Sequence, residues 1–155
     1  MSKEWLKNLL GMNVSDMELL HIPHPRTELT IHVTLKTVQA GALLGTCIVG
    51  PVKQAIQGPH ELRDFQRAAL NAGYTGALVG LVAGPILSLL RCHNLNSLEV
   101  YDRCYRLRFN RTQLNVDRAS VVGATIGAGV SGPAGAVIGV DVGTIAATLW
   151  NRVAG

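Results

Sequence analysis

Residues 119–151 read ASVVGATIGAGVSGPAGAVIGVDVGTIAATLWN and carry a single charged residue, Asp141. Crossing an apolar layer of about 30 Å takes roughly 20 helical residues at about 1.5 Å each. This stretch is too long for one crossing and long enough for two short ones. Gly132-Pro133 lies near its middle, where one helix can end and the next can begin with proline at its first position. The sequence therefore predicts a tight helical hairpin over 117–132 and 133–151.

Two further stretches lack Asp, Glu, Lys and Arg: residues 37–52 and residues 68–90. They predict membrane helices over about 30–54 and 68–91. Residues 29–36 alternate apolar and polar as a strand would, but an open strand cannot continue into lipid, so a helix is favoured. The expected fold is all-α, an integral membrane protein with four short glycine-rich transmembrane helices over 29–152. Three crossings with a re-entrant tail remain the alternative.

The composition agrees with a membrane protein. Of the 155 residues, 48% are hydrophobic and only 15% are charged, whereas soluble domains average about a quarter charged. This excludes intrinsic disorder, and three cysteines exclude a disulfide-dense secreted scaffold. The net charge of +4 comes from residues between the apolar stretches, as in the loops of membrane proteins. We therefore expect no nucleic-acid partner.

Small residues recur every four positions in the predicted helices. A four-residue period leaves a nearly straight ridge without side chains, along which two helices can approach closely. The spacing does not distinguish contacts within the chain from contacts with a partner subunit. The glycines predicted to pack helices are Gly41, Gly45, Gly76, Gly80, Gly84, Gly123, Gly127, Gly135, Gly139 and Gly143.

A basic loop is expected at 91–118, between the second and third helices. Tyr101, Tyr105 and Phe109 recur at four-residue spacing, so part of the loop can form an amphipathic helix at the lipid headgroups. We expect four arginines to contact an anionic phospholipid such as cardiolipin, or an acidic partner surface: Arg103, Arg106, Arg108 and Arg111. Cys92 and Cys104 share the loop and could form a disulfide in an oxidising compartment.

Residues 1–28 form an N-terminal extramembrane segment in this prediction. A short amphipathic turn around Trp5 should end at Gly11, and Ser15 with Glu18 fits a capping box. His32 is expected at the membrane interface. Asp141 should be a buried, hydrogen-bonded carboxyl at a helix contact, with an ion or proton pathway as the alternative.

No catalytic constellation and no metal or cofactor site is expected. Gly127-Ala-Gly-Val-Ser-Gly132 satisfies G-x-G-x-x-G, but a dinucleotide site also needs a following helix, a second strand and a later acid. The remaining chain is too short to supply them. A soluble nucleotide-dependent enzyme is therefore the least favoured class.

Over residues 37–150 the chain resembles the mitochondrial inner-membrane translocase channel family, the Tim-type preprotein and amino-acid transporter superfamily. The resemblance rests on the four glycine-ridged helices, the polar loop, Asp117 before the third helix and the hairpin at Gly132-Pro133. The family signature has Arg, three residues, Asp, then Gly-x-x-x-Gly. Asp117 and Gly123-x-x-x-Gly127 match it in kind, but Gln113 stands where Arg is expected. This departure favours a divergent member such as the accessory subunit of respiratory complex I.

The resemblance implies a non-catalytic accessory subunit of a mitochondrial inner-membrane complex, most simply NADH:ubiquinone oxidoreductase (complex I), with membrane subunits as partners. The alternative is a protein-translocase or channel component, whose polar groove would carry Gln39, Thr46, Asn71 and Thr75. With four crossings, Lys53, Arg63 and Arg67 lie on one side and all other Lys and Arg on the opposite side. The positive-inside rule places that more basic side in the matrix, whereas the resemblance implies the intermembrane space and is preferred here.

Overall fold

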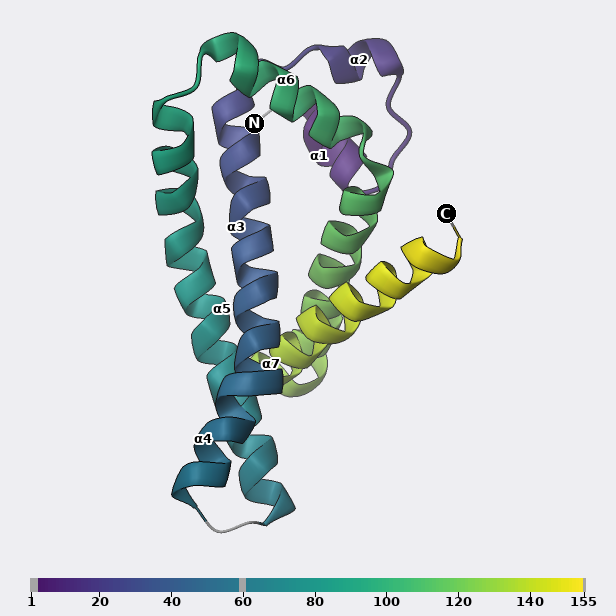
Figure 1. Cartoon of the computed structure of the whole chain (residues 1–155). Helices are drawn as coiled ribbons and strands as arrows, with labels where there is room; N and C mark the ends of the chain where they lie inside the picture. Colours follow the sequence, from purple (N-terminus) through teal and green to yellow (C-terminus); the bar gives the residue numbers. More distant parts are fainter. Residues whose placement is uncertain (1–2, 59–60, 155) are drawn as a thin grey trace.

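The computed structural model describes residues 3–58 and 61–154, and every regular element in this part of the chain is helical (Figure 1). The predicted all-α class is confirmed. In chain order the elements are α1 (Lys3–Leu9), α2 (Asp16–Leu20), α3 (Pro25–Leu44), the π-helix η1 (Gly45–Val49), α4 (Gly50–Gln57), α5 (Leu62–His93), α6 (Ser97–Phe109) and α7 (Arg111–Val153).

Three helical stretches are long and apolar enough to cross a membrane: Pro25–Gln57, Leu62–His93 and Arg111–Val153. They contain the predicted helices, but each begins earlier than expected. Proline at the first helical position starts α3 at residue 25. Glu28 therefore belongs to α3 and not to the segment before it.

The third stretch, α7, folds back on itself at the predicted turn. Ser131 leaves the helical region and Gly132 has φ 57°, a left-handed value that glycine adopts without steric cost. Pro133 then starts the returning arm with the φ that a first helical turn requires. Residues 111–130 and 133–153 therefore run as two antiparallel arms (Figure 1), and Asn115 Nδ2 donates to Asn151 Oδ1 at 3.2 Å near their far ends.

The glycine ridges lie where helices of this chain touch each other. A side chain on Gly41, Gly45 or Gly80 would overlap the backbone of the opposite helix at Gly76, Ala72 or Thr37. In the hairpin the corresponding backbone contacts join Gly123 to Gly139, Gly127 to Gly135, and Gly143 to Ala119. The ridges therefore join α3–η1 to α5, and one arm of α7 to the other, within the chain.

The π-helix η1 interrupts the first long helix just before Pro51. The Gly50 N–H donates to the carbonyl of Gly45, five residues earlier. Pro51 has no N–H to donate and its ring disfavours the ordinary helical geometry of the preceding turn. Single π-turns of this kind are frequent at functional sites, and Thr46 of η1 is part of the site described below.

Three short helices, α1, α2 and α6, cover the end of the molecule where α3 begins (Figure 1), and we call them the helical cap. The core beneath them contains Ile22, Leu29, Cys92, Val100 and Cys104. The segment expected as a loop at 91–118 is helical over most of its length: it holds the end of α5, all of α6 and the start of α7.

The N-terminal predictions are also seen. Gly11 has φ 78° after the α1 turn, and Ser15 and Glu18 form both hydrogen bonds of a capping box at α2. The Ser15 backbone N–H and hydroxyl donate to the Glu18 carboxylate and lower the pKa of that carboxyl below its ordinary value.

Candidate functional site: a polar stripe between α3 and α7

One face of the first long helix presents His32, Lys36, Gln39 and Thr46 to α7. Their spacing of four, three and seven residues places them on a single helical face. The opposing side chains are Asp117 and Ser120 from the first arm of α7, with Asp141 and Thr144 from the second arm. We call these eight residues the polar stripe.

Asp117 is the centre of the upper half of the stripe. Its carboxylate is 2% exposed and lies 2.9 Å from His32 Nδ1 and 2.7 Å from Lys36 Nζ. Gln39 Nε2 donates to Asp117 Oδ1 at 3.0 Å. The Lys36 ammonium balances the carboxylate charge, and the three partners explain how an acid can be buried between these helices.

Gln39 and Ser120 extend the network along the helices. Gln39 Nε2 also donates to Ser120 Oγ at 2.8 Å, and that hydroxyl donates to the Asp117 backbone carbonyl at 2.9 Å. Lys36 Nζ donates to Gln39 Oε1 at 3.3 Å. Both polar ends of the Gln39 amide are therefore bonded, and α3 is held in one register against the first arm of α7.

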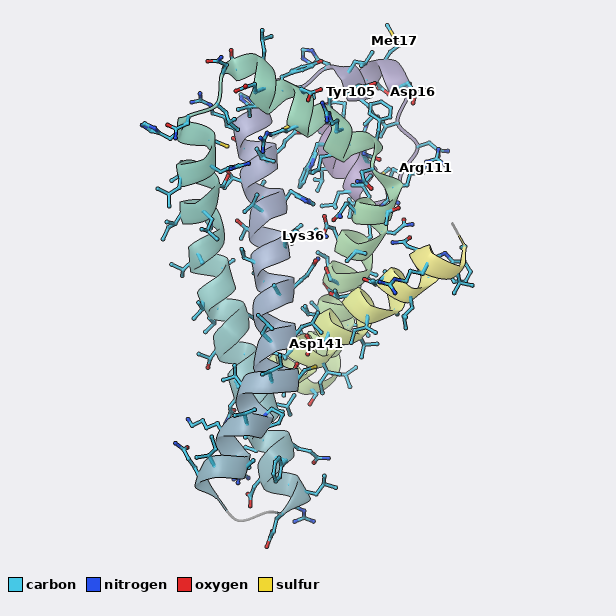
Figure 2. The ribbon with its side chains drawn as sticks, in the orientation of Figure 1. Asp16, Met17, Lys36, Tyr105, Arg111 and Asp141 are labelled. Carbon is cyan, nitrogen blue, oxygen red and sulfur yellow. The ribbon has the colours of Figure 1, made fainter. Side chains whose placement is uncertain are left out.

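Lys36, labelled in Figure 2, also borders a cavity between α3 and the ends of the two arms of α7. This cavity of about 420 Å³ is lined by Lys36, Thr112, Gln113, Val116, Thr148, Asn151 and Arg152. Asn151 Nδ2 donates to the Thr112 carbonyl at 2.9 Å and ties the arms together there. Two basic side chains, Lys36 and Arg152, therefore line a cavity at the upper end of the polar stripe.

The lower half of the stripe contains Asp141, where the second arm of α7 crosses the first long helix (Figure 2). Thr46 Oγ1 donates to Asp141 Oδ2 at 2.7 Å, and the aspartate is 9% exposed. The prediction of a buried, hydrogen-bonded carboxyl at a helix contact is confirmed. Asp141 Oδ1 and Thr144 Oγ1, however, have no hydrogen-bond partner within the described residues.

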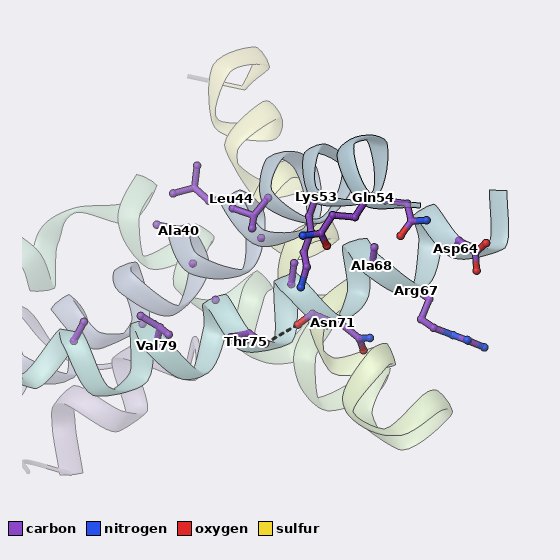
Figure 3. Close-up of a pocket in the computed structure, with 18 of the residues that line it drawn as sticks. Ala40, Leu44, Lys53, Gln54, Asp64, Arg67, Ala68, Asn71, Thr75 and Val79 are labelled. Carbon is purple, nitrogen blue, oxygen red and sulfur yellow. Dashed lines mark hydrogen bonds between the residues drawn. The ribbon is translucent and has the colours of Figure 1, made fainter. Parts of the chain in front are cut away.

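A second cavity, of about 970 Å³, lies between the α3–η1–α4 stretch and α5 (Figure 3). We call it the small-residue groove, because eight of the residues that line it are alanine or glycine in the helices on either side: Ala40, Gly41, Gly45, Ala68, Ala72, Gly76, Gly80 and Ala83. Asn71 and Thr75 also line this groove, whereas Gln39 and Thr46 face α7. The expectation that these four polar residues share one groove is wrong, because they lie on different faces of the α3–α5 pair.

The four arginines predicted at lipid or a partner surface have different environments. Arg103 is half-buried, Arg111 is exposed at the start of α7, and Arg106 is exposed with its guanidinium 2.7 Å from Asp102. Arg108 is only 2% exposed, so its prediction as a surface contact is wrong.

Arg108 instead pairs with Glu28 inside the helical cap. Its Nη2 and Nε donate to the Glu28 carboxylate at 2.6 and 2.9 Å. Its Nη1 donates to the carbonyls of Leu19 and His21 at 2.9 and 3.2 Å. One guanidinium therefore joins α6 to α3 and to the end of α2. No spacing rule in the sequence relates residues so far apart.

Cys92 and Cys104, considered for a disulfide, are both free thiols in the structure. Both are buried in the core of the cap, where Cys104 Sγ donates to the Pro25 carbonyl at 2.8 Å. Burial, with a smaller contribution from the nearby Glu28 charge, raises the pKa of Cys104 from 9.0 to about 12. Cys104 is thus a neutral packing residue at physiological pH.

The His32 ring forms a hydrogen bond with Asp117, and its predicted place at the membrane interface stays a prediction. The four-residue spacing of His32 and Lys36, followed by Gln39, was the signal that could have identified a polar face. Within the described residues, no three His, Cys, Asp or Glu side chains gather as they would around a bound metal ion.

Comparison with known families gives one assignment. The family described as Protein of unknown function (DUF1757) matches residues 5–150, which include α7 through Trp150 and both halves of the polar stripe. No curated protein matches the chain. Since the family match extends over almost the whole sequence, this chain is a member of the DUF1757 family.

Proposed function

We propose that this chain is a non-catalytic structural subunit of a mitochondrial inner-membrane complex, with respiratory complex I as the favoured complex. In this proposal all four helical arms cross the bilayer, α7 contributing two. The sequence resemblance to the Tim-type superfamily supports the mitochondrial location. The observation that carries the subunit role is the small-residue groove on the outside of the α3–α5 pair.

The groove suits a transmembrane helix from another subunit. Small side chains along it allow close backbone approach, which drives helix association where lipid removes the hydrophobic effect. Val79 of α5 borders the groove and is 62% exposed. The glycines themselves are already used within the chain, so it is the alanines beside them that offer the partner a surface.

One end of the groove is polar. Lys53, Gln54, Asp64 and Arg67 line it near the turn between α4 and α5 (Figure 3). A partner helix that ends at this level can place its polar terminal residues there, at the membrane boundary. The groove therefore offers an apolar contact along the bilayer and a polar contact at its edge.

The test compares two exposed valines of α5. Val79→Phe fills the groove, whereas Val82→Phe is the matched control because Val82 is 65% exposed and does not line it. Each tagged variant is expressed in cells lacking the native chain and analysed on native gels with an in-gel NADH dehydrogenase stain. We expect the wild type and Val82→Phe to comigrate with active complex I and Val79→Phe to be lost from that band.

Comigration with a different membrane complex would keep the structural role and exclude complex I. A chain that runs as a free monomer, in cells whose complex I stays intact after its deletion, would contradict the proposal. Equal comigration of the two phenylalanine variants would remove the groove as the docking surface.

A protein-translocase or channel component remains the second candidate, because the polar stripe runs between helices proposed to cross the membrane. Ionisable groups at that depth frequently line transport pathways. Photo-crosslinkers at Asn71 in the groove and at Gln39 in the stripe should then capture precursor proteins during import. The absence of such adducts at both positions would exclude this candidate.

A further inference from the structure

Among the described residues, Asp141 has no basic partner to balance its charge. The stretches that surround it, residues 37–52, 68–90 and 119–151, contain no Lys, Arg or His, and no other Asp or Glu. The only other titratable side chains in them are Cys47, next to Thr46, and Tyr74. By contrast, Asp117 has Lys36 and His32. A carboxylate buried among helices without a counter-charge is costly, so a positive charge must come from outside the chain.

Three helical segments meet around this carboxylate. Thr46 of η1 donates to it, and Gly73 of α5 lies against the side chains of Thr46 and Val137, one turn before Asp141. Gly73 therefore brings α5 against the two residues that flank this site, Thr46 and Val137. The carboxylate lies beside the point where α3–η1, α5 and the second arm of α7 meet.

Two oxygens here lack partners although they are buried. Asp141 Oδ1 and Thr144 Oγ1 are one helical turn apart on the same arm, and both residues are 9% exposed. Buried polar atoms nearly always have a hydrogen-bond partner, so each exception needs an explanation. Threonines in these helices normally bond to the carbonyl four residues earlier, as Thr34 and Thr148 do. Thr144 does not, so its hydroxyl neither donates nor accepts a hydrogen bond within the described residues.

We propose that Asp141, Thr144 and Thr46 form a binding site for one monovalent cation of the size of sodium. One carboxylate charge is neutralised by one positive charge, whereas a divalent ion would leave an excess charge in an apolar surrounding. Carboxylate and hydroxyl oxygens are the hard ligands that alkali and alkaline-earth ions prefer. A bound ion gives both unpartnered oxygens, Asp141 Oδ1 and Thr144 Oγ1, a ligand contact at the same time.

The ion competes with a proton for the same carboxylate. When the ion leaves, Asp141 takes up a proton and becomes neutral, because the unpaired anion is too costly at this depth. Dicyclohexylcarbodiimide modifies protonated carboxyl groups in apolar surroundings, so its rate of reaction reports how often the site holds a proton.

The experiment uses the full chain in lipid nanodiscs and follows modification of Asp141 by peptide mass spectrometry. Sodium chloride is compared with choline chloride at equal ionic strength. Sodium at about ten times its dissociation constant should slow the modification about tenfold by mass action. Potassium chloride in a third sample reports selectivity for size.

Variants test the assignment of ligands. Thr144→Val removes the hydroxyl at nearly constant volume and should abolish protection by sodium while Asp141 is still modified. Thr144→Ser should retain the protection. Thr125→Val is the matched control and should behave as wild type. Thr125 is exposed, and its hydroxyl donates to the Val121 carbonyl of its own helix.

Equal modification rates in sodium and choline would overturn the proposal and assign the carboxyl to protons alone. Failure of Asp141 to react in either salt would also overturn it, since the site would then never hold a proton. Full protection in Thr144→Val would remove Thr144 from the site. None of these outcomes depends on the complex in which the chain resides, so this inference and the proposed subunit role fail separately.

Discussion

At the scale of single residues, the helical cap depends on one buried ion pair. Arg108 makes two hydrogen bonds to Glu28 and two to backbone carbonyls, so all of its charge is locally compensated. Removing one partner of such a pair leaves an uncompensated buried charge, which costs far more than the intact pair contributes. The pair therefore makes the position of α6 on α3 specific.

We predict that Arg108→Met lowers the free energy of unfolding by about 3–5 kcal/mol, because the Glu28 carboxylate stays buried without a partner. The double variant Arg108→Met, Glu28→Met should recover most of this loss, since neither charge then remains. Thermal unfolding in mild detergent measures both effects. Arg106→Met is the control, and its exposed pair with Asp102 is expected to contribute at most about 1 kcal/mol.

A double variant as unstable as Arg108→Met alone would contradict this account. It would mean that the guanidinium stabilises the cap mainly through the carbonyls of Leu19 and His21 and not through the charge of Glu28.

We predict a pH dependence from Cys104. Its pKa is about 12 in the folded chain and 9.0 when exposed. Between pH 9 and pH 12 the thiol is therefore ionised in the unfolded chain and still protonated in the folded chain. Stability from this group is therefore constant below pH 9 and falls as the pH rises toward 12. We expect the free energy of unfolding to fall more between pH 8 and pH 10 in the wild type than in Cys104→Ala. Denaturant unfolding of both proteins at the two pH values measures this difference. Identical pH profiles for the two proteins would exclude the effect.

At the scale of elements, the hairpin of α7 is held by backbone contact between its arms. Gly127 lies directly against the Gly135 carbonyl, whereas Gly129, two residues later on the same arm, has no atom within 4 Å of the position of a Cβ. Both are helical glycines of the first arm, so their intrinsic helix preferences are equal. They differ in whether the opposite arm leaves room for a side chain.

We predict that Gly127→Leu separates the arms and destabilises the chain by about 1–3 kcal/mol, as overpacking does elsewhere. Gly129→Leu should be neutral or slightly stabilising because it removes an exposed helical glycine. Differential scanning fluorimetry of the two variants in the same detergent makes the comparison. Equal melting temperatures would show that the arms do not touch as described.

The elements were predictable from the sequence to different degrees. Charge-free length identified the long helices, Gly132-Pro133 located the turn, and Ser15 with Glu18 predicted the capping box, because each of these signals is local. The partner of each glycine ridge was not predictable, since a four-residue spacing fits any neighbouring helix. Glu28 with Arg108 and Gln39 with Asp117 were missed because their pairing depends on how distant helices are placed.

At the scale of the whole molecule, polar groups lie at the two ends and along the polar stripe between them. The helical cap, the start of α7 and the C-terminus lie at one end, and the turn between α4 and α5 lies at the other (Figure 1). Arg118 ties α1 to this arrangement by donating to the Leu9 carbonyl at 3.0 Å. Between the two ends, the outward faces of α5 and α7 carry exposed Leu, Ile and Val side chains. This distribution suits a chain whose middle is surrounded by lipid.

The arrangement of polar ends and an apolar middle also gives a prediction that distinguishes four membrane crossings from three. If both arms of α7 span the bilayer, a cysteine at Lys3 and a cysteine at Ala154 lie on the same side, and a cysteine at Gln57 lies on the other. We therefore expect Lys3→Cys and Ala154→Cys, in a chain whose natural cysteines are alanine, to react alike with a membrane-impermeant maleimide in mitoplasts. Gln57→Cys should react only after the membrane is opened, since the resemblance to the translocase family puts the termini in the intermembrane space. With three crossings and a re-entrant tail, Ala154→Cys would instead follow Gln57→Cys, because the second arm of α7 would enter and leave the membrane through the same face.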